Sequence, residues 1–213
     1  MKARGERQER EGGCPMAKSD VLQPFILSWE GGFVNDPADA GGATNKGVTI
    51  GTFRQVFGKD KTVADLKAMT NAQWHTIFKK FYWDRWRADE IMNQSIANTC
   101  VDWVWASGSY GITNVQKLLG VTADGVVGPK TIAALNSKDA KKLFRDIYAA
   151  RLSYYNRIIQ ASVQKYERKI GRKSTRQEQL KYTNERFRKG WIRRLDGIQY
   201  GSLIYNNGLM VRF

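Results

Sequence analysis

Residues 28–49 read SWEGGFVNDPADAGGATNKGVT, and this stretch decides how the rest of the chain is interpreted. Apolar residues recur at helical spacing over residues 21–29, which predicts a helix that ends beside Glu30. One of the two glycines that follow is expected to close this helix in a left-handed conformation. Residues 33–47 are rich in Gly, Asn, Asp and Pro and predict a loop or a short hairpin. The stretch therefore presents one carboxylate at a helix C-terminus, next to a long polar segment.

The remaining sequence is patterned mainly for helices. Thr62 and Thr70 are each followed three residues later by a side chain that can complete an N-terminal cap. Strand signals are confined to residues 33–35 and 47–50. The sequence thus predicts a mainly α fold with a small β element beside the polar segment. The helices expected from apolar spacing are residues 74–81, 91–106, 112–119 and 129–135, a long helix capped by Ser137, and a last helix over 180–198.

Composition limits the class of protein. With 213 residues, of which 42% are hydrophobic, the chain can bury a core and form one ordinary domain, or one domain with a small appendage. No apolar run approaches the roughly 20 residues of a membrane-spanning helix. The N-terminal residues MKARGERQEREGGCP lack an apolar segment, so no signal peptide is expected and synthesis in the cytoplasm fits. Cys14 and Cys100 do not make a disulfide framework.

The charge of the chain points to an anionic partner without choosing one. The formal net charge is +15, and residues 165–194 hold twelve Lys or Arg against three Glu. A solvated helical face would explain this cluster, as would binding to nucleic acid, a membrane surface or a polyanionic cell wall. No nucleic-acid recognition motif accompanies the cluster, so we expect no nucleic-acid partner.

Candidate chemistry is narrowed by what the sequence lacks. His75 is the single histidine, so a metal site or a His-dependent nucleophile is not expected, and no phosphate-binding loop motif is present. Acid–base chemistry must then come from carboxylates, of which Glu30, Asp36 and Asp39 are the candidates. Aromatic neighbours would desolvate Glu30 and raise its pKa, while the aspartates of the polar segment should stay ionised. The alternative is that Glu30 is a surface residue at a helix end, followed by an ordinary connection.

The polar segment resembles a family signature. Glu30-Gly31-Gly32-Phe33 matches the EGGY-like motif of glycoside hydrolase family 108, the phage-type N-acetylmuramidases, with Phe in place of the common Tyr. The N-D-P…GG…TN-x-G-[IV]-T run of that family is matched within residues 35–49. The change to Phe removes a hydroxyl group and leaves the ring. The resemblance implies a lysozyme-like α+β fold whose small β element lies next to the active-site loop.

The same resemblance implies roles for individual residues. Glu30 is expected to be the general acid of a glycosidase. Asp39 follows it by nine positions, as in phage-type lysozymes with a Glu…Asp…Thr site, and is the first choice to activate water or stabilise the cation. Asp36 is the reserve for this role. Thr44 comes one residue earlier than the threonine of that pattern and is assigned, with Asn45 and Asp36, to substrate binding.

A second resemblance lies downstream. Residues 118–131, LLGVTADGVVGPKT, resemble the D-G-x-x-G-P-x-T core of predicted peptidoglycan-binding modules. The alternative is that the Asp, Gly and Pro of this segment serve only the turn of a helix–turn–helix. The domain organisation that follows is a charged tail at residues 1–18, a catalytic region at 19–90, a peptidoglycan-binding helical module at 91–170, and a C-terminal helix and tail at 171–213 that pack on the same globule.

The expected function is hydrolysis of the β-1,4 bond between N-acetylmuramic acid and N-acetylglucosamine in peptidoglycan. No cofactor is expected, and Trp29, Phe33, Trp103 and Trp105 are candidates to line a sugar groove. The resemblance implies a monomeric endolysin that a holin releases from the bacterial cytoplasm to the wall, with no stable membrane insertion. A lytic transglycosylase acting on the same bond and a non-catalytic wall-binding protein are the alternatives.

Overall fold

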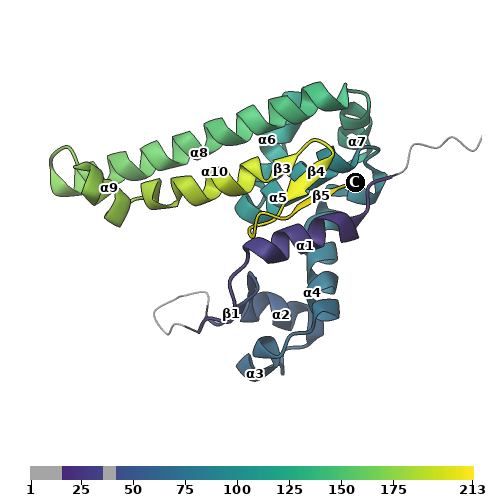
Figure 1. Cartoon of the computed structure of the whole chain (residues 1–213), viewed down its shortest axis with the longest axis horizontal. Coiled ribbons are helices and arrows are strands. Elements are labelled where there is room, and N and C mark those ends of the chain that lie inside the picture. The colour runs from purple at the N-terminus through teal and green to yellow at the C-terminus, as the bar shows by residue number, and fades with distance from the viewer. Residues whose placement is uncertain (1–15, 36–41) are drawn as a thin grey trace, which may run out of the picture.

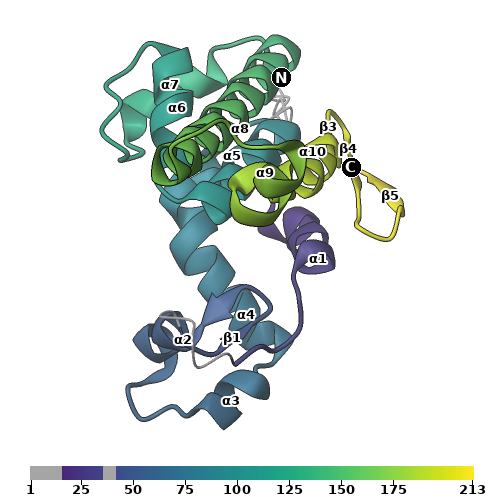
Figure 2. The ribbon, with the colours of Figure 1, turned by 90° about the vertical axis from the view of Figure 1, so that its left-hand side faces the viewer.

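The computed structural model describes residues 16–35 and 42–213. These residues form a helical body and a small lobe that is set apart from it (Figure 1; Figure 2). The chain begins in the body with α1, Ser19–Trp29, and then enters the lobe. It returns to the body through α5, Gln94–Ser107. The end of α1 is therefore one of the places where the two parts join.

The small lobe consists of a short hairpin and three helices. Strands β1, Thr44–Asn45, and β2, Val48–Thr49, pair antiparallel, and an isolated bridge joins Val34 to Thr44. Lys46 and Gly47 form the turn with φ of 49° and 76°, because a two-residue hairpin of this hand needs positive φ at both positions. The helices that complete the lobe are α2, Ile50–Phe57, α3, Val63–Lys67, and α4, Asn71–Phe78.

Helix α4 continues into less regular turns that lead back to the body. A π-helical turn over Lys79–Trp83 is followed by 3-10 turns at Asp84–Trp86 and Ala88–Glu90. Such π-turns widen a helix by one residue and re-aim the side chains that follow. This one carries Tyr82 against Trp105 of α5, with ring centroids 4.5 Å apart.

The body is built around α5. Every residue from Ser95 to Val104 of this helix is buried, so polar as well as apolar side chains lie in the core. The long α8, Ala140–Ile170, crosses the body and extends past it, with α9 and α10 beneath it (Figure 1). The other elements are α6, Tyr110–Leu119, α7, Pro129–Asn136, α9, Arg176–Tyr182, α10, Arg188–Asp196, and the antiparallel sheet of β3, Ile198–Gln199, β4, Ser202–Ile204, and β5, Met210–Arg212.

The structure confirms the mainly α class with a small β element, and the capping boxes at Thr62 and Thr70. Several sequence predictions were wrong in detail. Ser137 ends α7, and α8 is capped instead by Asp139, whose side chain accepts from the Lys142 amide. The predicted last helix is interrupted where Thr183 takes an extended conformation and caps a 3-10 turn. The C-terminal sheet was not predicted, because its strands are only two or three residues long.

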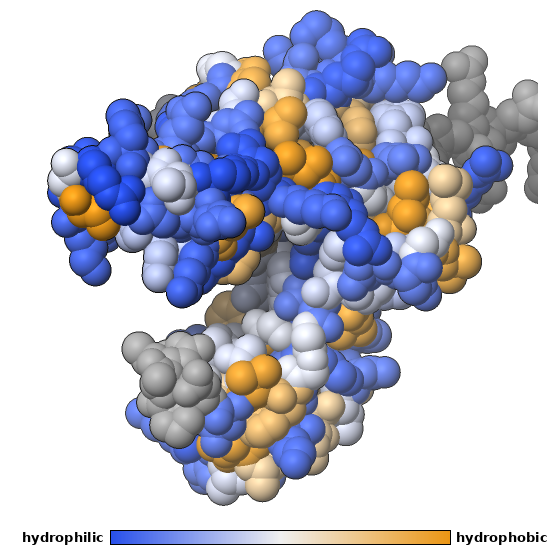
Figure 3. Space-filling view, turned by 60° about the vertical axis from the view of Figure 1, so that its left-hand side comes forward, coloured by the Kyte–Doolittle hydropathy of each residue, from blue (hydrophilic) through white to orange (hydrophobic). Residues whose placement is uncertain are grey.

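One region of the body projects beyond the rest and is called the arm, residues 165–194. It contains the end of α8, all of α9 and most of α10 (Figure 1). In the space-filling view a hollow separates the arm from the small lobe, and the arm's surface there is largely hydrophilic (Figure 3). Within the described residues, no helix is long and apolar enough to span a membrane.

Candidate active site

Glu30 lies at the junction of the small lobe and the body. It is the C-terminal cap of α1 with φ −87° and ψ 142°, so the chain leaves the helix in an extended conformation. The expected left-handed glycine cap is therefore wrong, since neither Gly31 nor Gly32 has positive φ. The extended exit turns the carboxyl group inward, where its side chain is only 16% exposed.

Two donors from the body hold one oxygen of this carboxyl group. Glu30 Oε1 accepts a hydrogen bond from the Trp105 indole N–H at 2.6 Å and from Arg194 Nη1 at 2.9 Å. Trp105 comes from the end of α5 and Arg194 from α10. The surroundings of Glu30 thus include an aromatic ring, Trp105, and a cation, Arg194, and the cation was not expected.

The hairpin turn of the lobe lies against the other oxygen of the carboxyl group, Oε2. A Cβ atom at Gly47 would lie 2.7 Å from Glu30 Oε2 and 2.6 Å from the Trp105 ring, so only glycine fits there. The turn is held in place because the Trp74 indole donates to the carbonyl of Lys46 at 2.9 Å. Glu30 is therefore contacted by both the lobe and the body, and part of its side chain stays accessible.

Tyr82 belongs to the same cluster. Its ring lies against Trp105, and burial raises the pKa of its phenol, with the negative charge of Glu30 as the second cause. An un-ionised phenol in this position can donate or accept a hydrogen bond near the carboxyl group.

A buried chain of charges stands behind Arg194. Asp102 Oδ1 accepts from Arg194 Nε at 3.1 Å and Nη2 at 2.8 Å, and Asp102 Oδ2 lies 2.7 Å from Arg151 Nη2. The second contact is a close ion pair rather than a well-directed hydrogen bond. Asp102 and Arg151 are completely buried. Burial acts to raise the pKa of Asp102, but Arg194 and Arg151 outweigh it and hold the pKa below its usual range.

The other predicted site residues have different fates. Asp36 and Asp39 lie outside the described residues. Asn45 is buried, and its amide donates to the carbonyls of Leu66 and Lys67 at 2.9 and 3.2 Å, so this nitrogen joins β1 to α3. Thr44 is half-buried in β1. Substrate binding by Thr44 and Asn45 stays a prediction.

Four aromatic residues were predicted to line a sugar groove. The prediction is wrong for Trp103, because this side chain is fully buried. Trp105 lies at the acid itself. Trp29 is half-buried beneath the Arg193 guanidinium at 5.4 Å, and Phe33 lies under the Lys67 ammonium at 5.6 Å. These aromatic faces remain candidates for stacking against a sugar.

Comparison with known proteins agrees with this geometry. Residues 23–108 match the glycosyl hydrolase 108 family, and residues 110–196 match a family described as a predicted peptidoglycan domain. Residues 23–108 are thus a glycosyl hydrolase 108 region, and the predicted peptidoglycan domain follows it. The structure of Brucella abortus SagA is similar, with a TM-score of 0.62 and 28% identity over 83% of this chain and 88% of SagA. No curated protein sequence matches this chain.

Membership in glycosyl hydrolase 108 supports a lysozyme-like hydrolase that acts on peptidoglycan. The first matched region contains Glu30, Trp105 and Asp102, and the second contains Arg151 and Arg194. The ion pair between Glu30 and Arg194 therefore crosses from one matched region to the other. The domain boundaries given in the sequence analysis stay predictions.

The turn at residues 124–131 is closed by internal hydrogen bonds. The buried amide of Gln116 donates to Asp124 and accepts from the Gly125 amide, each at 2.9 Å. The backbone N–H of Val126 and the Gln116 amide hold the pKa of Asp124 below its usual value. These bonds give the Asp and Gly of the motif a role in turn formation.

Other reactive side chains lie away from the site. His75 is exposed on α4, and Cys100 is buried in α5, where burial raises the pKa of its thiol. Among residues 16–35 and 42–213, no cluster of His, Cys, Asp or Glu is arranged to hold a metal ion.

Sequence reasoning missed Arg194, Asp102 and Tyr82. Arg194 is one of many cations in a basic segment, and 164 positions separate it from Glu30, so no local pattern singles it out. Asp102 carried a weak signal, because it is an acidic residue inside an otherwise apolar helix and such residues are seldom buried without a partner.

Proposed function

We propose that the protein is an N-acetylmuramidase that cleaves the β-1,4 bond between N-acetylmuramic acid and N-acetylglucosamine, with Glu30 as the general acid. The observation that carries the proposal is the placement of Glu30. Its carboxyl group is mostly buried, oriented by two donors, and located where the lobe and the body meet. The hollow between the lobe and the arm offers a path for a glycan strand (Figure 3).

The proposed reaction begins with transfer of the Glu30 proton to the glycosidic oxygen. The bond from that oxygen to the anomeric carbon breaks, and positive charge develops on the sugar ring as an oxocarbenium ion. Water then adds to the anomeric carbon and loses a proton to a second carboxylate. Asp39 is our first choice for that carboxylate and Asp36 the reserve. A separation of about 6.5–9.5 Å from Glu30 would favour inversion of configuration.

The variant Glu30→Gln tests the acid. The glutamine amide oxygen can still accept from Trp105 and Arg194, so the fold should be kept while the transferable proton is lost. We expect no release of reducing ends from purified peptidoglycan, with binding to it unchanged. Glu90→Gln is the matched control, because the Glu90 side chain pairs with Arg87 at the surface and makes no hydrogen bond to Glu30, Trp105 or Arg194.

The products separate the remaining functions. New reducing ends identified by mass spectrometry indicate a muramidase, whereas 1,6-anhydro ends would identify a lytic transglycosylase. Binding without new ends in the wild-type protein would indicate a wall-binding protein. Normal hydrolysis by Glu30→Gln would show that the acid is a different residue.

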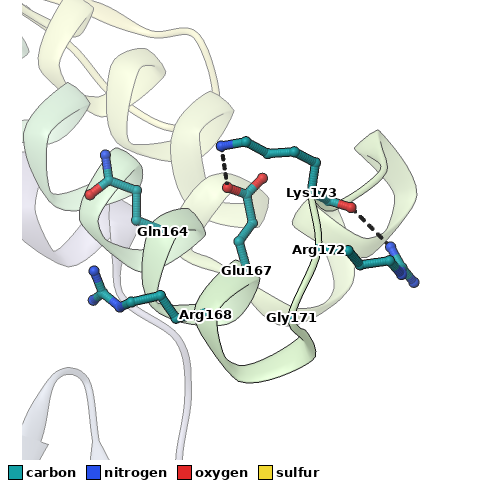
Figure 4. A pocket seen from close by; sticks show the side chains of 6 residues that line it. All are labelled: Gln164, Glu167, Arg168, Gly171, Arg172 and Lys173. Atoms are coloured by element: carbon teal, nitrogen blue, oxygen red, sulfur yellow. Dashed lines mark hydrogen bonds and ion pairs between the residues drawn. The ribbon is translucent and has the colours of Figure 1, made fainter.

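The arm supports attraction to an anionic wall. All of its glutamates are used internally: Glu167 pairs with Lys173, Glu178 with Arg172, and Glu185 with Arg176 and Arg188. Figure 4 shows Glu167 pointing toward Lys173 at the end of α8, while Arg168 extends to the other side. The exposed cations of the arm that make no ion pair with any described residue are Lys165, Arg168, Lys169, Lys181, Arg186, Lys189 and Arg193.

These cations would concentrate the protein at a polyanionic surface, an effect that salt screens. Salt should therefore lower activity on whole cells more than activity on a short neutral oligosaccharide, and equal losses would contradict this role. Retention on DNA above about 0.2 M salt would instead favour a nucleic-acid partner, because purely electrostatic binding weakens steeply there. Release through a holin and a monomeric state stay predictions.

A further inference from the structure

We infer that Arg194 is a positioning residue for the acid: together with Trp105 it occupies one oxygen of Glu30, so that the transferable proton is carried by the other oxygen, Oε2. The inference rests on the proposed role of Glu30. It adds a residue from the peptidoglycan-binding region to the machinery of the hydrolase region. No local motif marks Arg194 in the sequence.

The first argument for this role comes from the two hydrogen bonds that Glu30 Oε1 accepts. A carboxyl oxygen has two lone-pair directions in its plane. Both are used at Glu30 Oε1, by the indole N–H of Trp105 at 2.6 Å and by Arg194 Nη1 at 2.9 Å. A proton on this oxygen would have to displace one of these donors. The proton that Glu30 delivers is therefore held on Oε2, the oxygen that faces Gly47 of the hairpin turn.

The second argument comes from the fixed orientation of the Arg194 guanidinium group. Its guanidinium group gives Nε and Nη2 to Asp102 and leaves Nη1 for Glu30. A planar guanidinium held by two of its three nitrogens has little freedom to rotate, so the direction of the third N–H is fixed. The ring of Phe25 in α1 lies against the same group, with 6.0 Å between the guanidinium carbon and the ring centroid.

The third argument comes from the buried charges behind Arg194. Asp102 is completely buried and is fixed from its other side by Arg151, whose Nε donates to the Tyr155 hydroxyl at 2.7 Å. The chain Glu30–Arg194–Asp102–Arg151 alternates acidic and basic side chains, and the buried Asp102 carboxylate pairs with both arginines. A charge buried without a partner is costly, so this chain resists rearrangement and gives Arg194 one stable position. Three body helices, α5, α8 and α10, thereby set the direction of one bond to the acid.

The test compares Arg194→Gln and Arg194→Lys with the control Lys189→Gln. Lys189 lies exposed on the same helix, so its variant makes the same change in net charge without touching the site. The full chain is assayed for kcat and KM on soluble glycan fragments, and the folded fraction is measured by thermal unfolding.

We expect Arg194→Gln to lower kcat about 10- to 100-fold with KM changed less than about twofold, because misplacing a catalytic group by about 1 Å can have an effect of that size. Arg194→Lys should also lose kcat with KM nearly unchanged, because an ammonium cannot reproduce the planar fork of the guanidinium. Lys189→Gln should match the wild type.

A purely structural role would give a different result. If both Arg194 variants lose activity only in proportion to their folded fraction, the positioning role is wrong. It is also wrong if Arg194→Gln behaves like Lys189→Gln. Activity of Glu30→Gln at the wild-type level would instead refute the assignment of the acid. The Arg194 variants therefore test the positioning role, and Glu30→Gln separately tests the assignment of the acid.

Discussion

Replacing Gly47 with alanine should damage both the stability and the activity of the protein, because this turn lies directly against the acid. At φ 76° an alanine takes a left-handed conformation, which costs about 1–2 kcal/mol. The new methyl group would also lie 2.6 Å from Trp105 and 2.7 Å from Glu30 Oε2, and overpacking of this kind costs about 1–3 kcal/mol. The free energy of unfolding should therefore fall by about 2–5 kcal/mol.

The effect of Gly47→Ala on activity follows from the same contact. To reach an ordinary separation near 3.4 Å, the Glu30 carboxyl group must move by about 0.7 Å. A displacement of this order is expected to lower kcat by about 100-fold, measured as reducing ends released under conditions where the variant is folded. Gly51→Ala in α2 is the control, because its nearest contact would be an ordinary 3.8 Å. Activity of Gly47→Ala within twofold of the wild type would refute the packing of the turn against the acid.

Three further perturbations test other parts of the structure. Trp105→Phe keeps an aromatic ring but removes a hydrogen-bond donor to Glu30. Because a hydrogen bond to a charged group contributes about 1.5 kcal/mol, kcat should fall about tenfold. The control Trp103→Phe, at a fully buried tryptophan, should affect only thermal stability. Asp102→Asn should lower the free energy of unfolding at pH 7 by about 3–5 kcal/mol. The pKa of Asp102 is depressed in the folded protein, so its contribution to the free energy of unfolding is present above its ordinary pKa and is lost as pH falls through the pKa of the folded state. The free energies of unfolding of wild type and variant, measured with denaturant, should therefore converge below about pH 4. A constant difference down to about pH 2 would contradict the ion pairs. The double variant Lys165→Gln/Lys169→Gln should make lysis of whole cells less sensitive to salt while leaving hydrolysis of a neutral oligosaccharide unchanged, and the reverse pattern would contradict attraction by the arm.

The sequence was most informative where local rules act. Helical spacing predicted α1 and α5, and capping chemistry predicted the starts of α3 and α4, because these signals depend on residues three or four positions apart. The break between α9 and α10 was not predicted, since Thr183 interrupts a pattern that is otherwise continuously helical. The C-terminal sheet also escaped prediction, because such short strands are stabilised by their tertiary surroundings.

The same limit applies to the site. Glu30 was found because its motif is local, and its position at the end of α1 follows from the apolar pattern before it. The expectation of a purely aromatic environment was incomplete, because Arg194 arrives from a distant helix and brings Asp102 with it. Asp102 lies within the helix predicted over residues 91–106 but was not singled out, because its buried ion pairs depend on α8 and α10 packing around α5. Such contacts between distant elements become visible only in the folded chain.

The ion pair between Glu30 and Arg194 also bears on how such enzymes can be recombined. A wall-binding segment is often pictured as a cassette that can be exchanged to redirect a lysin to another bacterium. Here, a graft that replaced residues 110–196 would remove Arg194 and Arg151 and leave Asp102 as a buried charge without a counterion. A working chimera would have to inherit both arginines from the same parent as Asp102, so the two matched regions are best transplanted as one unit.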